Sequence, residues 1–383
     1  MKTTKTADNS ANNSTNTNTS EHFKTVLNIN FYVMKKQILF LLVAFMATAS
    51  AFGQTVPRAP ICDDTPLNPI AGKNYTYAVN VAAPYTTPQA YDWYVTDDPT
   101  FITGSVPTYN GLITNAMGII TAGSGYHDPA AGSNSVQIMW SGLAVANAAS
   151  KPYFLVINYK GTNGTLCEAM NMKVYKIEPK NAFTLDITNV NATTDLGLDG
   201  SNLAVQNSMC ASDIASASYI GSNMVYDYGV NYLVFKVVAA NFTKGWTPSI
   251  KVSGLNGGQT VGSIEWSSTT TFTGTGNFTD ATGTWIADAH VPAPADNLTD
   301  DGEAIYVRVA VNNGTYEGIA NTPITIAVDG ETDDLQPDVH YADCLADGFT
   351  NDVATQVILG RPNVTSNTVD FATTPNTLPF ILP

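Results

Sequence analysis

The amino-acid sequence predicts an all-β protein built from two antiparallel β-sandwich domains in tandem. Many short segments place an apolar residue at every second position, and Pro, Gly, Asn and Asp fill the pieces between them. No segment shows a convincing amphipathic helical pattern. Only 13% of the residues are charged, and Thr, Asn, Gly and Ser fill the polar positions, as is typical of extracellular β-structure. A sandwich is the natural packing for strands that each have one apolar face to bury.

Residues 34–53 form a three-part secretory signal. Lys35 and Lys36 make a positive start, Ile38–Ala47 is an unbroken apolar run, and small residues follow at positions 49, 50, 51 and 53. The apolar core extends at most to Phe52 and is then 15 residues long, whereas a membrane span needs about 18 to 20. We therefore prefer a cleaved signal with Gln54 as the first mature residue over a retained anchor; cleavage before Phe52 also satisfies the small-residue rule.

Residues 1–33 are polar and rich in Thr, Asn and Ser up to Ser20. Such a composition buries too little apolar surface to fold. The segment is either an unusually long start of the signal or the product of an upstream start codon, and we favour the second interpretation. Together, residues 1–53 are a leader that is lost on export.

The exported part of the chain is strongly acidic. Without residues 1–53, 12 of the 17 basic and 30 of the 32 acidic residues remain, a formal charge of −18. This charge argues against nucleic acid and anionic membranes as partners, because both bind clustered Lys and Arg. It suits a soluble exported protein, or one that binds cations through its turns.

The first domain is predicted over residues 54–178, after a proline-rich lead-in at Thr55–Pro69. Five segments follow the two-residue period of strands. With the residues that we expect on one face, they are NYTYAVNV (Tyr75, Tyr77, Val79, Val81), YDWYV (Tyr91, Trp93), SVQIMW (Val136, Ile138, Trp140), YFLVINY (Tyr153, Leu155, Ile157, Tyr159) and MNMKVYKI (Met170, Met172, Val174).

The segment EPKNAF, Glu178–Phe183, predicts a domain boundary, and the second domain is predicted over residues 183–344. Its clearest strand is AIYVRVAV, in which we expect every second residue from Ile305 to Val311 to face inward while Tyr306 and Arg308 face water. The stretch 195–222 has no steady period, so it is predicted as a loop with one short helical turn around residues 211–217. The other expected strands are FTLDITNV, NYLVFKVVAANF, PSIKVSGL, SIEWSS, GTWIADAHV and TPITIAVDG.

Residues 345–383 are predicted to form an extended C-terminal tail, because the chain there is punctuated by proline and offers one apolar patch, TQVILG. An alternative is a donor strand that pairs with a neighbouring subunit and fills its pockets with Phe380, Ile381 and Leu382.

The exported chain holds four cysteines, an even number that favours two disulfides in an oxidising compartment. Three pairings are formally possible. We predict Cys62 with Cys167 and Cys210 with Cys344, because each bond then closes one predicted domain. In the alternative, one or more of the four thiols stay free.

The first series of strands resembles the PKD-like and immunoglobulin-like domains of bacterial exported surface proteins. The resemblance covers residues 62–178, and it is carried by YDWYV, SNSVQIMW, YFLVINY and Cys167 just before MNMKVYKI. It implies two immunoglobulin-like antiparallel β-sandwich domains in tandem and a role as a spacer, an adhesive module or a protein-binding module. The leader ending AFGQ resembles those of bacteria that use type IX secretion, but the last residues do not match the sorting domain of that route.

No catalytic, cofactor-binding or metal-binding residue is predicted. The exported chain has three histidines, His127, His290 and His340, and none of the short sequence motifs of zinc proteases, serine hydrolases or P-loop enzymes. GSGYHD, residues 123–128, is interpreted as a turn, since triad residues come from separated segments. A pair of glycosidase carboxylates leaves no local pattern, so the sequence does not test for one.

Two acidic loops could supply the six to eight oxygen ligands that Ca²⁺ takes, although neither has EF-hand spacing. Solvated turn acids explain them as well, and we prefer that explanation. Three tryptophans could instead form a sugar-stacking platform, or belong to the core. The loop residues are Asp296, Asn297, Asp300, Asp301 and Glu303, and Asp329, Glu331, Asp333, Asp334 and Asp338; the tryptophans are Trp246, Trp266 and Trp285.

The sequence therefore predicts an exported, non-catalytic surface or extracellular protein without a cofactor, which binds other surface proteins or glycans or builds extracellular structure. One alternative is a carbohydrate-binding module or a glycosidase-associated protein. The other is a self-assembling surface-layer or filament subunit that uses the C-terminal segment as a donor strand. The predicted location is secreted or cell-surface, and the periplasm remains an alternative.

Overall fold

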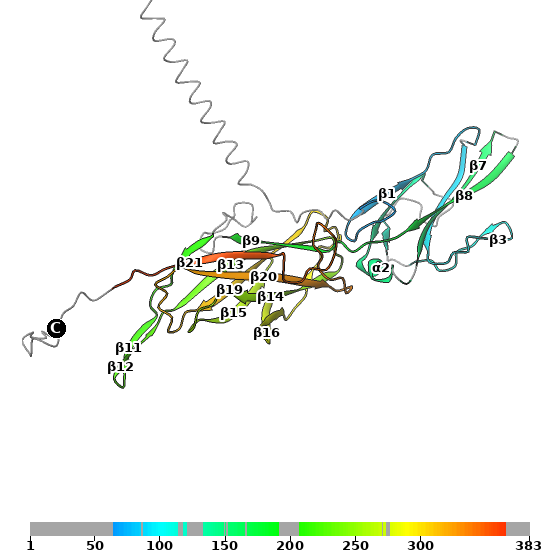
Figure 1. Cartoon of the computed structure of the whole chain (residues 1–383). Helices are drawn as coiled ribbons and strands as arrows, with labels where there is room; N and C mark the ends of the chain where they lie inside the picture. Colours follow the sequence, from blue (N-terminus) through cyan, green and yellow to red (C-terminus); the bar gives the residue numbers. More distant parts are fainter. Residues whose placement is uncertain are drawn as a thin grey trace, which may run out of the picture. The chain divides into compact units, whose positions relative to one another are not determined.

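The computed structural model describes residues 64–364, apart from residues 86, 114–117, 121–132, 149, 151, 165–166, 191–206, 270 and 273–275. In this part of the chain nearly all regular structure is β-strand, in two antiparallel sandwiches (Figure 1). A short helix, α2 (Gly142–Asn147), is capped by Ser141, whose side chain accepts a hydrogen bond from the Ala144 N–H. The predicted fold class, all-β with two antiparallel sandwiches that follow one another along the chain, is confirmed. The immunoglobulin-like topology stays a prediction. The leader, the GSGYHD turn and residues 380–382 lie outside the described residues.

The first sandwich packs two three-stranded sheets around one core. Trp93, Trp140 and Tyr153 are fully buried at its centre, and the rings of Trp140 and Tyr153 lie 5.8 Å apart between centroids. One sheet has the order β1 (Asn74–Ala78), β6 (Ser135–Trp140), β5 (Gly118–Ile120), and the other β2 (Thr87–Thr96), β7 (Tyr153–Asn163), β8 (Cys167–Ile177), beside a small hairpin of β3 (Ile102–Thr103) and β4 (Val106–Pro107).

The predicted inward face is correct for β1, β6 and β7 but wrong for β8. In β8, Tyr175 and Ile177 pack against the core, whereas Met170 and Val174 are exposed. The segment carries apolar residues on both faces, so its two-residue period does not choose between them. Ile177, which is buried opposite Tyr153 of β7, fixes the register, and a shift of one residue would turn every side chain over.

The second sandwich has one sheet of β9, β13, β19 and β15, and a second sheet of β10, β21, β20, β14 and β17, with β18 beside β14; β16 pairs with both β15 and β17 and so joins the two sheets. The bounds are β9 (Thr184–Val190), β10 (Ser208–Cys210), β13 (Val230–Ala240), β14 (Gly245–Ser253), β15 (Thr260–Ser267), β16 (Gly276–Ala281), β17 (Thr284–Ala287), β18 (Val291–Pro292), β19 (Glu303–Asn312), β20 (Thr322–Thr332) and β21 (Val353–Leu359).

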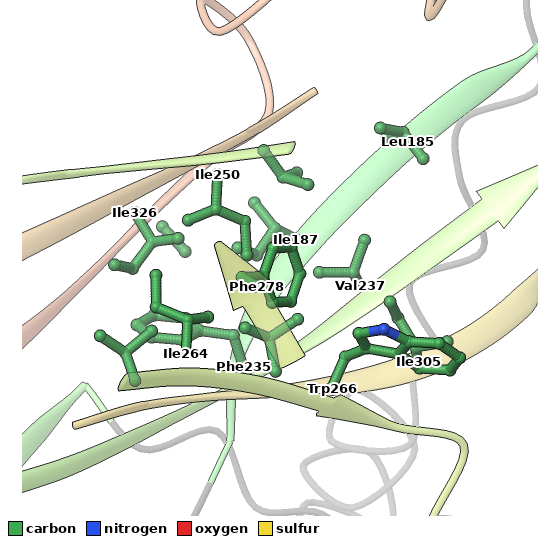
Figure 2. Packing of buried hydrophobic residues seen from close by; sticks show 14 of the residues in the cluster. Leu185, Ile187, Phe235, Val237, Ile250, Ile264, Trp266, Phe278, Ile305 and Ile326 are labelled. Carbon is green, nitrogen blue, oxygen red and sulfur yellow. The ribbon is translucent and has the colours of Figure 1, made fainter. Parts of the chain in front are cut away.

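The core of this sandwich is built from branched and aromatic side chains of both sheets. Figure 2 shows Ile250 and Ile326 from one sheet close to Phe235 and Ile264 from the other. The two hydrophobic cores divide the chain between Ala182 and Phe183, within the segment EPKNAF. The exact domain limits remain a prediction.

Strand β19 confirms the predicted inward face and corrects the outward one. Every second residue from Ile305 to Val311 is buried, as expected. Tyr306, predicted to face water, is only 6% exposed, and in the register it lies between Lys236 of β13 and Ser267 of β15. Because β19 is a central strand, its neighbours cover side chains on the outer face as well. Arg308 stays partly exposed and pairs with Glu265 at 2.6 Å.

Part of the predicted C-terminal tail is a strand of the second sandwich. Strand β21 pairs with β20 on one side and with β10 on the other, and it adds Ala354 and Ile358 to the core. The buried Gln356 side chain crosses to the opposite sheet, where its Nε2 donates to the carbonyl oxygens of Val234 and Val190 at 2.7 and 3.3 Å. The sequence shows only one short apolar patch here, because half of β21 faces polar surroundings.

The helical turn predicted around residues 211–217 is also wrong. Residues 211–215 are irregular, and β11 (Ser216–Ile220) begins a hairpin with β12 (Asn223–Asp227). The run of small residues that suggested a helical turn has no apolar stripe to bury, so its conformation follows the β-pairing instead.

Both predicted disulfide pairs are wrong, because Cys167 and Cys210 carry free, exposed thiols. Cys344 is disulfide-bonded, and Cys62 lies outside the described residues. Cys210 lies opposite Leu359, at the Thr322 end of β20, whereas the turn that holds Cys344 lies near Gly330. Eight residues of strand separate these ends by about 26 Å, and a disulfide needs Cα atoms within about 7 Å.

Replacement of Ile358 tests whether β21 belongs to the core. We expect Ile358→Ala to lower the free energy of unfolding by about 2 to 5 kcal/mol, because it removes a buried side chain and leaves a cavity. The neighbouring Leu359, 40% exposed on the other face, serves as the control, and Leu359→Ala should cost well under half as much. Equal losses in denaturant titrations of the two variants would contradict the assignment.

Thiol labelling tests the cysteine assignment. In the native, unreduced protein we expect a maleimide to modify Cys167 and Cys210, since both thiols are exposed and free. Cys344 should remain unmodified until the protein is reduced. Peptide mass mapping reads out all three positions, and protection of Cys167 or Cys210 before reduction would contradict the structure.

Candidate functional site

An exposed apolar hairpin extends from one end of the second sandwich (Figure 1). All ten residues of β11 and β12 are exposed. Tyr219 and Ile220, next to the turn, are 69% and 63% exposed, and Met224, Val225 and Tyr226 add further apolar surface. A soluble protein seldom gathers large apolar side chains in such an exposed position without a binding function.

The local sequence explains why a hairpin forms here. Ile220 pairs with Asn223, so Gly221 and Ser222 alone make the turn. Gly221 has φ of +68°, a conformation that glycine adopts without strain. A two-residue loop with glycine first is a preferred connection between twisted antiparallel strands.

The base of the hairpin is held rigidly. Arg361, two residues after β21, donates from Nη2 to the Tyr228 carbonyl at 2.8 Å and from Nη1 to the Ser212 carbonyl, and its guanidinium stacks on the Tyr228 ring. Asn313 Nδ2 donates to Ser212 Oγ at 3.0 Å. A Cβ at Gly229 would lie 2.6 Å from the Asp213 carbonyl, so the chain passes close to itself here. The apolar strands are therefore presented from a fixed base.

A second candidate site is a group of three carboxylates in the connection from β20 to β21. Asp338, Asp347 and Asp352 each offer an oxygen, and these oxygens lie within 4.8 Å of one another. Asp352 immediately precedes β21, and its carbonyl accepts a hydrogen bond from the Val328 N–H of β20. The Asp338 N–H donates to the Gly330 carbonyl. Three carboxylates at this separation can hold a divalent cation.

The electrostatics of this group are unfavourable to three separate negative charges. Burial, followed by the neighbouring carboxylates, raises the pKa of Asp338 and Asp352 far above the usual range of an aspartate. Burial also raises the pKa of Asp329, with a further contribution from Asp347. The cluster therefore needs protons or a cation to be stable in the folded chain.

Of the acidic loops singled out in the sequence, only part of the second enters this cluster. Asp338 belongs to it and Asp329 lies near it, whereas Asp334 pairs with Lys244 at 2.7 Å and Asp333 with His290 at 2.6 Å. Asp347 and Asp352, in the predicted tail, escaped the sequence analysis. Their spacing from Asp338, nine and fourteen residues, follows no known metal motif, so only the tertiary structure brings the three together.

The first acidic loop forms local turn contacts. Asp296 accepts from the Leu298 N–H at 3.1 Å and Asn297 from the Lys244 N–H at 3.4 Å. Burial raises the pKa of Asp300 and of Glu303. Among the described residues this loop joins no group of metal-ligand type.

The other candidates do not assemble into sites. Trp246 is fully buried and Trp266 is 9% exposed, both in the second core, with Trp285 packed partly buried against it, so the proposed sugar-stacking platform does not form. His290 pairs with Asp333, and His340 lies 3.8 Å from Asp343. His127 lies outside the described residues.

An open groove of about 410 Å³ lies on the described part of the first sandwich. It runs between β8 and the segment after β1, and Lys173 is the one lining residue with a formal charge at neutral pH. Two lining residues are joined by a hydrogen bond: the Tyr159 hydroxyl donates to the Tyr85 carbonyl at 2.5 Å. With few polar groups converging on it, the groove suggests no particular chemistry.

No protein-family model matches the sequence, and no curated protein is significantly similar to it. Solved structures with a similar fold include the collagen adhesin of Staphylococcus aureus (8% identity, TM-score 0.21, covering 76% of this chain and 82% of that one). They also include the major pilin subunit of Bacillus cereus (6%, 0.26, 75% and 70%) and the major pilin SpaD of Corynebacterium diphtheriae (8%, 0.23, 74% and 60%).

The carboxylate cluster predicts an unusual dependence of stability on pH in the presence of a chelator. An aspartate whose pKa is raised by folding contributes stability at low pH that is lost as the pH rises through the folded pKa, which is about 7 for Asp352. We expect the melting temperature, followed by circular dichroism in EDTA, to fall by several degrees between pH 5 and pH 8. Asp352→Asn should flatten this profile, and an unchanged slope in that variant would contradict the assignment.

Proposed function

We propose that the chain is an exported, non-catalytic module of the bacterial cell surface that binds another protein through the β11–β12 hairpin. The observation that carries the proposal is the hairpin itself, an apolar surface in which every residue is exposed and whose base is fixed by Arg361 and Asn313. A surface that projects from a fixed base suits binding, because less backbone motion is lost on association.

The sequence supports the same function. The predicted secretory signal at residues 34–53 takes the chain out of the cytoplasm, and the acidic, Thr- and Asn-rich composition suits an extracellular protein. In the described part of the chain, no helix has both the length and the apolar character required to cross a bilayer. The PKD-like assignment of residues 62–178 remains a prediction.

The side chains on the hairpin support a protein partner rather than a glycan. The hairpin strands carry Tyr219, Ile220, Met224, Val225 and Tyr226, a mixture of aliphatic and aromatic side chains. Sugar-binding surfaces depend instead on flat aromatic platforms flanked by polar groups, and two of the three candidate tryptophans are buried. The self-assembling alternative makes the partner a second copy of this chain.

Site-specific photocrosslinking in the producing cells tests the proposal. With p-benzoylphenylalanine in place of Tyr219, we expect an adduct between this chain and a second polypeptide after irradiation. The same amino acid in place of Tyr232, an exposed tyrosine on β13 outside the hairpin, is the matched control and should give no adduct. Protease treatment of intact cells checks surface exposure.

The outcomes separate the alternatives. An adduct of twice the chain mass supports self-assembly, and an adduct with another protein supports the adhesive function. Equal adducts at positions 219 and 232, or none at position 219 in cells that display the chain, would overturn the assignment of the hairpin as the binding surface.

A further inference from the structure

We propose that Asp338, Asp347 and Asp352 bind one Ca²⁺ ion that fastens the connection between β20 and β21. The three carboxylates come from separate positions of one connection and converge so that an oxygen of each lies within 4.8 Å of the others. Their role is independent of the hairpin and of the function proposed for it.

The hydrogen bonding of Asp338 points to a missing ligand. This residue is 1% exposed. Its Oδ1 accepts a hydrogen bond from the Leu185 N–H at 3.0 Å, whereas no N–H or hydroxyl group donates to its buried Oδ2. Only a proton shared with the carboxyl of Asp352, or a cation, would give this side of Asp338 a partner. A buried carboxylate oxygen without a donor is costly, because it has lost its water and gained no substitute.

Asp347, in the same cluster, also has one carboxylate oxygen that accepts a hydrogen bond and one that does not. Its Oδ2 accepts from Asn351 Nδ2 at 3.1 Å, while its buried Oδ1 has no donor. Two buried carboxylate oxygens in one cluster thus lack a partner of positive charge or an N–H group. A cation between them would satisfy both at once.

The surrounding charges strengthen this inference. None of the ion pairs among the described residues includes Asp338, Asp347 or Asp352. Asp329 and Asp186 add negative potential at the cluster. The Nζ of Lys251 lies 4.1 Å from the centroid of the Phe349 ring. Its positive charge partly offsets the rise in the pKa of Asp329. The net field is therefore negative and attracts a cation.

The donor set favours Ca²⁺. All three candidate ligands are hard carboxylate oxygens, which are the ligands of Ca²⁺ and Mg²⁺ rather than of softer metals. Oxygens up to about 4.8 Å apart can be bridged at Ca²⁺–O distances of about 2.3 to 2.6 Å. Ca²⁺ accepts irregular geometry and can complete its shell with water and backbone carbonyls of the connection, whereas Mg²⁺ demands a near-ideal octahedron.

The position of the site gives the ion a structural role. Asp338 is the sixth residue after β20 and Asp352 immediately precedes β21, so one ion links the first third of the connection, residues 333–352, to its end. Strand β21 contributes to the core and leads to Arg361 at the hairpin base. Loss of the ion should therefore loosen β21 first.

Calcium titration of the full chain after EDTA treatment and dialysis tests the proposal. We expect isothermal titration calorimetry with CaCl₂ to show one equivalent bound. We also expect the melting temperature at pH 7.5 to be higher in CaCl₂ than in EDTA, and MgCl₂ at the same concentration to have a smaller effect.

Two variants locate the ion. Asp352→Asn and the partly exposed Asp347→Asn should each lower calcium affinity at least tenfold and abolish the calcium-dependent rise in melting temperature. Asp301→Asn removes the same charge from an exposed position in the other acidic loop and should leave both unchanged. Near-ultraviolet circular dichroism verifies that each variant is folded, and with two ligand variants the test survives the misfolding of one.

The proposal is overturned if the folded chain binds no calcium, or if both ligand variants bind it as the parent does. It is equally overturned if acid stabilises the chain and calcium does not, since the carboxylates are then satisfied by protons. A magnesium effect equal to that of calcium would overturn the choice of ion.

Discussion

The docking of β21 into the second sandwich is the contact on which most of the remaining structure depends. Its Ile358 fills the core between the sheets, its backbone joins β20 to β10, and Gln356 donates across to carbonyls of β9 and β13. A strand that bonds to both sheets closes the side of the sandwich opposite to β16. Buried polar cross-links of this kind fix one register, since any shift would leave buried groups unpaired.

Both candidate sites lie at the ends of this strand. Before it, Asp352 belongs to the carboxylate cluster. After it, Arg361 holds the base of the hairpin through the carbonyls of Ser212 and Tyr228. A segment whose own stability comes from packing and hydrogen bonds thus positions a candidate cation site at one end and a candidate binding surface at the other.

The distribution of charge in the chain separates surface acids from buried ones. Acids such as Glu168 and Glu178 form ion pairs that are open to solvent, where such pairs contribute little. At the Asp338 cluster the same residue type is desolvated and crowded by like charge, which raises the pKa of its members. A net charge shared over the whole surface is easily tolerated, but buried charge of one sign has to be compensated locally.

The sequence by itself determined the fold class, the division into two cores near Phe183 and the inward faces of strands such as β7 and β19, because each depends on a local two-residue period of apolar side chains. Only the tertiary structure decided which face of β8 packs on the core, that Tyr306 is buried and that β21 pairs with β20 and β10. It also decided which cysteines carry free thiols. These depend on which strands become neighbours. The approach of Asp338, Asp347 and Asp352 has the same origin, since residues separated along a connection meet only when β20 and β21 pair.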